Sequence, residues 1–271
     1  MSQLPIGDPF ASHPPERVPL PRAPLVRVLA QVRFPMIASV ASADFIAPFQ
    51  ESIRKIFPVL KKDQTHEVVF GPKGAQHGSV KTAWRFHDLK NQWRVTLSSD
   101  FLAIETREYT RREDFLEHFE RVLVALSQHF EPSVVNRLGI RYVDKFEADA
   151  TESLREILPE LVSHPIAGPF GTGVGGRVTR SMQEVLIDLP DGAKLFSRWG
   201  LMPAGATYDP GVVPASAGES WVIDLDAFRS EQRAFSPSDE LESARVLSDH
   251  VYTMFRWCVT DKFIQRFGGK P

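Results

Sequence analysis

The chain has 271 residues, 42% of them hydrophobic, and a formal net charge of -2. This length allows a full hydrophobic core, and at roughly 100 to 200 residues per domain it corresponds to one large domain or two modest ones. The balanced charge gives no overall attraction to nucleic acid or to an anionic membrane. The single cysteine, Cys258, excludes an internal disulfide and every metal centre built from several cysteines.

The N-terminus does not combine a basic segment with an apolar run, and no stretch approaches the roughly 18 apolar residues of a membrane span. We therefore expect a cytoplasmic protein that does not enter the membrane. Residues 1–24 are rich in proline and poor in apolar side chains, which predicts an extended arm. Two interpretations of the arm stay open: a docking peptide for a partner or second subunit, and a loose terminus that lies along the surface. The prolines of the arm are Pro5, Pro9, Pro14, Pro15, Pro19, Pro21 and Pro24.

A buried strand is predicted over residues 25–34, and a helix over 44–57 from its apolar spacing. Four short antiparallel strands follow at 67–70, 80–87, 92–97 and 101–107.

The expected register of these strands follows from their turns. A turn centred on Leu89 and Lys90 places Phe86 opposite Trp93 and Arg85 opposite Arg94. A turn at residues 99–100 then places Glu105 beside Arg94, which relieves the repulsion between the two arginines.

The clearest helix is predicted at 110–130, with Thr110 and Glu113 as a capping box. A strand at 134–146 follows, and it lies near the midpoint of the chain. Its period of two places Leu138, Ile140, Tyr142 and Phe146 on one face and Arg137, Arg141 and Lys145 on the other.

The second half repeats this order of elements. A helix begins at Thr151, with Leu154, Ile157, Leu158 and Leu161 facing inward. Strands at 178–189 and 194–201 flank a Pro-Asp-Gly turn, a long loop covers 203–220, and a strand covers 221–228. A final helix begins at Ser236 and continues to Phe267.

These elements predict an α+β fold with curved, mainly antiparallel sheets packed by two long amphipathic helices. We expect the arm at 1–24, a first α+β half at 25–150 and a second at 151–271, together forming one compact unit. Because the halves share an order of elements, duplication is a hypothesis about the architecture.

The basic face is the main candidate binding surface. Arg137, Arg141 and Lys145 project together, and Arg85 and Arg94 join them if the sheets are neighbours. Guanidinium groups bind phosphate and carboxylate equally well, so three interpretations stay open: a salt-bridged face, an anion-binding site and a catalytic site. In the catalytic case Glu105 or Glu184 would hold a divalent ion, loosely as in triphosphate-tunnel enzymes, although their alternating Glu-x-Glu-x-Lys pattern is absent.

Other chemistries have weaker support. The eight histidines show none of the usual zinc spacings, so no metal or cofactor is predicted. A Gly-x-Ser-x-Gly turn is missing, and Cys258 lies at helical spacing among apolar residues, as a core side chain would. Residues 171–176 are rich in glycine but lie before a strand, which favours a loop over a phosphate-binding turn. Nucleic acid is disfavoured because the aromatic residues of the strands alternate with the arginines.

One resemblance covers most of the chain after the arm. Pro24-Leu25-Val26, the segment Gln31 to Pro35, the segment Asn136 to Asp144, and Asp249-His250 with Phe255 are similar to a sporadically distributed, uncharacterised bacterial protein family of about this length. The resemblance implies a bacterial accessory protein and supplies no catalytic residue.

From these observations we predict a non-enzymatic protein-interaction module whose partner is encoded nearby. It would use the arm, the 203–220 loop or the basic face. The alternative is binding, with or without hydrolysis, of a phosphate-rich small molecule or nucleotide on the basic face. Neither hypothesis specifies an oligomeric state.

Overall fold

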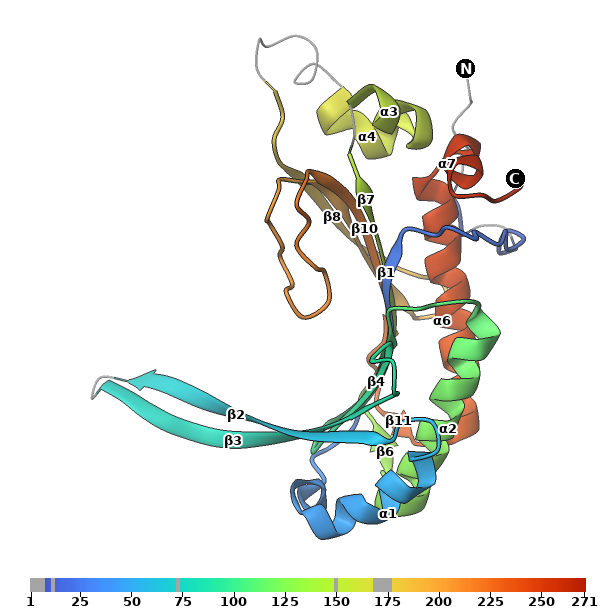
Figure 1. Ribbon diagram of the computed structural model, residues 1–271. Coiled ribbons are helices and arrows are strands. Elements are labelled where there is room, and N and C mark those ends of the chain that lie inside the picture. Colours follow the sequence, from blue (N-terminus) through green and yellow to red (C-terminus); the bar gives the residue numbers. More distant parts are fainter. Residues whose placement is uncertain (1–7, 11–12, 72–73, 149–150, 168–176) are drawn as a thin grey trace. The chain divides into compact units, whose positions relative to one another are not determined.

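The computed structural model describes residues 8–10, 13–71, 74–148, 151–167 and 177–271 (Figure 1). The side chains of 64–71, 74–81, 151–153 and 165–167 are not among those described. The glycine-rich segment at 171–176 and part of the arm lie outside the described residues.

The strands are β1 (Leu25–Arg33), β2 (Val59–Gly71), β3 (Gly74–His87), β4 (Trp93–Ser98), β5 (Phe101–Thr106), β6 (Val134–Val135), β7 (Arg137–Glu147), β8 (Ser181–Asp188), β9 (Lys194–Met202), β10 (Ser220–Arg229) and β11 (Arg233–Ala234). The helices are the 3-10 turn η1 (Ala38–Ala41), α1 (Ala43–Ile53), α2 (Arg112–Phe130), α3 (Thr151–Ile157), α4 (Glu160–Ala167), α6 (Pro237–Cys258) and α7 (Asp261–Arg266). None of these helices combines the length and the apolar character that a membrane span requires.

The strands form a nine-stranded sheet in the order β2-β3-β4-β5-β1-β7-β10-β9-β8 and a small sheet of β11 and β6. The prediction of an α+β fold with mainly antiparallel sheet and long helices is confirmed. The chain divides into two compact units, each made of separate stretches of sequence. Unit 1 contains 1–28, 140–228 and 246–271, and unit 2 contains 29–139 and 229–245. The predicted halves are contiguous stretches, whereas these units are interleaved, and duplication stays a hypothesis.

In unit 2, one predicted register is wrong and the other is confirmed. Phe86 lies opposite Val95, not Trp93, and His87 rather than Arg85 lies opposite Arg94. The cause is the turn at 88–92, where the Asp88 carboxylate accepts the main-chain N–H groups of residues 92 and 93 and residue 91 has φ 55°. This slip of two residues keeps every side chain on its predicted face. Glu105 lies directly opposite Arg94, as predicted.

Helix α2 has an apolar stripe whose side chains are buried: Phe115, Phe119, Val122, Leu123 and Leu126. The capping box is wrong, because the residue before the first turn is Arg111, which makes no side-chain cap, and Thr110 donates instead to the Asp114 carboxylate at 2.7 Å. Trp93 of β4 stacks on His118 of this helix, with 4.4 Å between ring centroids. Sheet and helix therefore pack through aromatic side chains in this unit.

In unit 1, β7, β10, β9 and β8 present one face to the second half of α6. Tyr142 of β7 hydrogen-bonds Ser248 of α6 at 3.1 Å, and Trp199 of β9 packs edge-on against Trp257. The loop at 203–219, drawn in orange, lies on the other side of these strands (Figure 1). Alternate residues of β7 therefore face either the helix or the loop.

The two remaining helical segments of unit 1 differ from prediction. The final helix does not continue to Phe267: α6 ends at Cys258, and Thr260 begins α7 by accepting the N–H of Phe263. Residues 151–167 form two short helices that break at Pro159. Leu161 consequently lies 59% exposed instead of facing inward, whereas Leu154 is buried as predicted.

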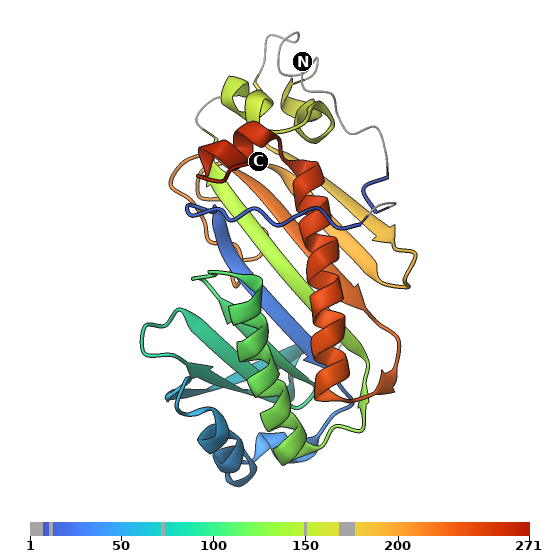
Figure 2. The same ribbon diagram turned by 90° about the vertical axis from the view of Figure 1, so that its right-hand side faces the viewer.

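The described part of the arm is extended and crosses α6 (Figure 2). Arg17 Nη2 lies 2.8 Å from Asp249 Oδ1, and Tyr252 accepts the main-chain N–H of Val18 at 2.7 Å. Arg22 donates its main-chain N–H to the carbonyl of Phe267. These contacts hold residues 17–22 on the helices of their own unit.

Candidate functional site

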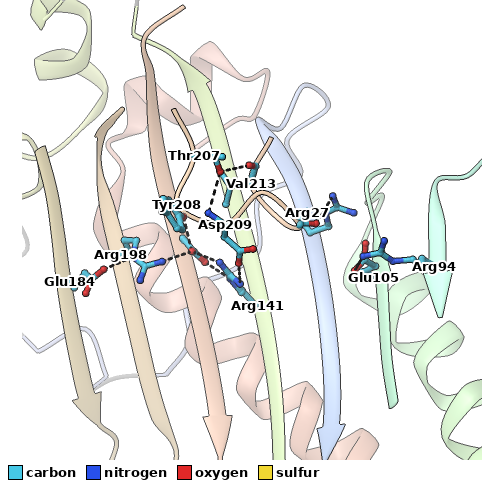
Figure 3. Close-up of polar contacts among 12 residues, drawn as sticks. Arg27, Arg94, Glu105, Arg141, Glu184, Arg198, Thr207, Tyr208, Asp209 and Val213 are labelled. Atoms are coloured by element: carbon cyan, nitrogen blue, oxygen red, sulfur yellow. Dashed lines mark hydrogen bonds and ion pairs between the residues drawn. The ribbon is translucent and has the colours of Figure 1, made fainter. Parts of the chain in front are cut away.

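A row of alternating charge crosses four strands of unit 1 on the face that the 203–219 loop covers (Figure 3). It contains Arg141 of β7, Asp224 of β10, Arg198 of β9 and Glu184 of β8, and the register places Arg198 directly opposite both Asp224 and Glu184. Residues directly opposite one another on neighbouring strands point to the same face of the sheet. The cross-strand pairing therefore places these four side chains in one row.

Arg141 and Asp224 form the centre of this row. Arg141 Nε lies 2.7 Å from Asp224 Oδ1 and Nη2 lies 2.8 Å from Oδ2, so the pair is bidentate. Burial lowers the pKa of Arg141, but hydrogen bonds and the charges of Asp224 and Asp209 outweigh burial and raise it above its ordinary value. The Asp224 side chain is only 3% exposed. A buried carboxylate stays ionised only where cations and hydrogen-bond donors compensate for its lost hydration, so Asp224 depends on these partners.

The 203–219 loop contributes Tyr208 and Asp209 to the same network. Tyr208 donates its hydroxyl to Asp224 Oδ2 at 2.7 Å, and Asp209 Oδ2 lies 2.9 Å from Arg141 Nη1. Burial and the negative charge of Asp224 raise the pKa of Tyr208, so the phenol stays protonated as the donor. The loop is thus bonded to the sheet through the side chains of the row.

Three further contacts hold the loop to the strands. Lys145 donates its ammonium group to the carbonyl of Pro214, and Arg27 Nη2 lies 3.4 Å from the carbonyl of Gly211. Val213 is fully buried and packs with Val143 of β7. The basic side chains that β7 presents on this face therefore serve as attachments for the loop.

The five predicted binding residues are not brought together within one unit. Arg141 and Lys145 belong to unit 1, and Arg137, Arg85 and Arg94 belong to unit 2. Arg85 pairs with Asp63, Arg94 pairs with Glu105 at 2.7 Å, and the guanidinium of Arg137 folds over Gly139.

The two glutamates predicted as ligands of a divalent ion are also paired with arginine. Glu105 binds Arg94, and Glu184 Oε1 lies 2.6 Å from Arg198 Nε. In the described part of the chain, no three His, Cys, Asp or Glu side chains gather as a group that could hold a metal ion.

A pocket of about 260 Å³ lies beside the row in unit 1. Its walls are the rings of Phe196 and Tyr208 and the charged side chains of Arg141, Arg198, Asp209, Asp224 and Asp226. The Arg198 guanidinium lies 4.4 Å from the centre of the Tyr208 ring and 5.1 Å from that of Phe196. The pocket is therefore an aromatic and charged concavity with more carboxylates than guanidinium groups in its walls.

Sequence reasoning missed the acidic half of this site. Asp224 and Asp226 occur two residues apart in the predicted strand at 221–228, and this alternation was a usable signal for an acidic face. Tyr208 and Asp209 carried no such signal, because they belong to a loop whose position depends on tertiary contacts.

On the opposite face of β7, Asp144 is buried against Cys258. Burial raises the pKa of Asp144 to about 7, and burial together with the Asp144 charge raises the pKa of the Cys258 thiol. The prediction that Cys258 is a core residue is confirmed, since it is fully buried. His250 of α6 lies 2.9 Å from Asp191 Oδ2 through Nε2.

Comparison of the sequence with models of protein families and with curated proteins finds no match. The resemblance to an uncharacterised bacterial family therefore stays a prediction.

Proposed function

We propose that this protein is a non-enzymatic interaction module that binds an extended segment of a partner protein alongside β8. The observation that carries the proposal is the exposure of β8, the last strand in the sheet order, which pairs with β9 among the described strands. Val185 and Leu186, in the middle of this strand, are 40% and 56% exposed. An edge strand of eight residues offers main-chain N–H and C=O groups to a further strand.

The side chains of β8 indicate the chemistry of the partner segment. Glu184, Leu186 and Asp188 alternate on the face shared with Arg198, and Val185 lies on the other face. A partner strand with basic residues beside the two carboxylates and an apolar residue beside Leu186 would complement this edge. Each favourable cross-strand pair contributes roughly 0.2 to 1 kcal/mol.

The proposed binding surface, β8, differs from the three surfaces that the sequence predicts, which are the arm, the 203–220 loop and the basic face. The described part of the arm, the 203–219 loop and the β7 cations already contact other groups of unit 1, so they offer less surface to a partner than β8 does. A bacterial cytoplasmic setting and a partner encoded nearby belong to the same proposal, and the sequence resemblance is what supports them.

The alternative function, binding of a phosphate-rich molecule, has weaker geometric support. Arg141 and Arg94 each bond a carboxylate, and Lys145 bonds a carbonyl. A phosphate would have to displace these acceptors and approach the remaining carboxylates of the pocket. The geometry thus favours an interaction module.

Native mass spectrometry of the full chain, purified gently from its own host, tests the proposal. We expect a co-purified protein at fixed stoichiometry that is retained by Leu161→Lys and lost in Leu186→Lys. The control is matched, because Leu161 is 59% exposed on α4 of the same unit and receives the same charge. Hydrogen exchange of the complex should show added protection of β8 amides.

Three outcomes would contradict the proposal: a complex equally stable in both variants, a homodimer held through β8 in place of a partner, or a small anionic adduct lost in Arg141→Glu. The last result would support the phosphate alternative.

A further inference from the structure

We infer that a cationic face of unit 2 binds a small tetrahedral oxyanion, the phosphate group of free phosphate or of a phosphate ester. This cationic face consists of Lys61 of β2, Arg85 and His87 of β3, and Arg94 of β4. All four residues belong to unit 2, whereas β8 belongs to unit 1, so the inference does not depend on the proposed function.

The register of three strands brings these side chains together. His87 lies directly opposite Arg94, and Lys61 lies opposite Arg85, which precedes His87 by two residues on the same strand. Residues directly opposite, and residues two apart on one strand, point to the same face of a sheet. The cationic face is therefore a consequence of the cross-strand pairing.

His87 and Arg94 have buried nitrogen atoms without a hydrogen-bond partner. Among the described residues, neither His87 Nδ1 nor Arg94 Nε has a partner, and His87 is only 9% exposed. The two side chains are close, because Asp88 donates its N–H to the carbonyl of Trp93 and the adjacent pair is then the non-hydrogen-bonded kind. A buried donor that lacks an acceptor costs free energy, and an oxyanion supplies the acceptor. A protonated imidazole donates from both ring nitrogens, including Nδ1.

The charge of this face is positive on balance. Arg85 pairs with Asp63, and Arg94 pairs with Glu105 (Figure 3). Lys61 adds a third cation, so three cations lie beside two carboxylates. Arg94 donates Nη2 to Glu105, which leaves Nε for a ligand. An oxyanion that binds Nε therefore does not have to displace either carboxylate.

The sheet is accessible to a small ligand beside Arg94. Helices α1 and α2 pack against the opposite face, where Phe86 and Trp93 contact their rings. On the cationic face, Thr96 follows Arg94 by two residues and Ala103 lies opposite Thr96. Both side chains are short and partly exposed, so an oxyanion can approach Arg94 over them.

Binding of a dianion should be coupled to protonation of His87. Burial lowers the pKa of His87, the charges of Lys61, Arg94 and Arg85 lower it further, and a hydrogen bond with the Asn91 side chain raises it. A dianion offsets these cations and favours the imidazolium, so the site takes up a proton together with the anion. The affinity should consequently rise as the pH falls from 8 to 6.

The test follows amide chemical shifts of the ¹⁵N-labelled full chain at constant ionic strength. Sulfate is the probe for the pH dependence, because it stays a dianion between pH 6 and pH 8. Inorganic phosphate and glycerol 3-phosphate are compared with each other at pH 7. We expect saturable shifts for residues 84–87 and 94–96 with all three anions and none with chloride. Sulfate should bind at least about fivefold more tightly at pH 6 than at pH 8.

Two lysine variants make a matched pair. Lys61→Met removes the added cation and should weaken sulfate binding about fivefold, corresponding to about 1 kcal/mol. Lys62→Met is the control, because Lys62 is the next residue of β2, is also exposed, and lies over the Trp84 ring of the other face at 4.9 Å. It removes the same charge and should change the affinity less than about twofold. In His87→Gln the sulfate affinity should no longer depend on pH, and an unchanged thermal midpoint verifies the fold of each variant.

The comparison of the two phosphates identifies the source of the anion. Affinities within about threefold of each other support free phosphate, and an ester that binds at least about tenfold more tightly supports a phosphorylated small molecule. The inference would be overturned by shifts that chloride reproduces, by equal weakening in the two lysine variants, or by a pH dependence that persists in His87→Gln.

Discussion

Replacement of Arg141 by methionine is the sharpest test of how the charge row contributes to stability. Methionine keeps most of the stem volume and removes three hydrogen bonds, two to Asp224 and one to Asp209. The Asp224 carboxylate, 3% exposed, then keeps the Tyr208 hydroxyl and the Arg198 guanidinium at 3.7 Å.

Removing one partner of a buried ion pair typically costs about 3 to 5 kcal/mol, because the other charge is left without compensation. Since Tyr208 and Arg198 still reach Asp224, we expect a loss near the lower end, about 3 kcal/mol. A second effect adds to it, because Asp209 no longer holds the loop to β7. Urea unfolding of the parent and variant at pH 7 measures the difference in the free energy of unfolding.

Arg85→Met is the control for this measurement. Arg85 pairs with Asp63 at the surface, with both side chains about 40% exposed, and exposed pairs contribute about 0 to 1 kcal/mol. In a double-mutant cycle, Arg141→Met combined with Asp224→Asn should cost clearly less than the sum of the single changes. A loss below about 1 kcal/mol for Arg141→Met, accompanied by a loss of ligand binding, would refute the structural role and identify Arg141 as a ligand residue.

Three further predictions concern single positions. Burial raises the pKa of Asp144 from 3.8 to about 7, so its contribution to stability is present at low pH and is lost as pH rises through about 4 to 7, in total about 4 kcal/mol. Asp144→Asn should therefore gain stability relative to the parent between pH 5 and pH 8 in urea unfolding, and an equal difference at both pH values would disprove the assignment. Gly200→Ala should destabilise by about 2 kcal/mol or more, since a Cβ there lies 1.9 Å from the carbonyl oxygen of Ser181, whereas Gly218→Ala meets nothing within 4 Å and should be nearly neutral in the same assay. Trp84→Phe removes a buried indole N–H that donates to a main-chain carbonyl at 2.7 Å, and thermal unfolding should report a loss of about 1 to 3 kcal/mol; an unchanged midpoint would show that this hydrogen bond contributes little.

Local patterns in the sequence were sufficient to predict the type and position of most helices and strands. The Pro-Asp-Gly turn before Ala193 produced the predicted hairpin of β8 and β9, and the strand at 221–228 became β10. Glu105 was placed beside Arg94 because a two-residue turn determines the register of both strands that it joins.

The predictions of a turn and of a helix end failed where a hydrogen bond to a side chain determined the backbone conformation. The turn after His87 is longer than expected because the Asp88 carboxylate caps it, and the register moved by two residues. The last helix ended early because Thr260 caps a new helix. Both choices depend on hydrogen bonds from the main chain to a local side chain, which hydrophobic periodicity does not detect.

By itself, the sequence determined which residues share a face of each strand, because that depends only on the period of the backbone. It placed Arg141 and Lys145 on one side of β7 and the predicted core residues Leu138, Ile140, Tyr142 and Phe146 on the other. Only the tertiary structure decided what the basic side meets: Asp224 is 83 residues away along the chain, and Asp209 belongs to a loop. Guanidinium groups bind carboxylate and phosphate with the same geometry, so the partner, and with it the sign of the pocket, depends on which distant segments the fold brings beside β7.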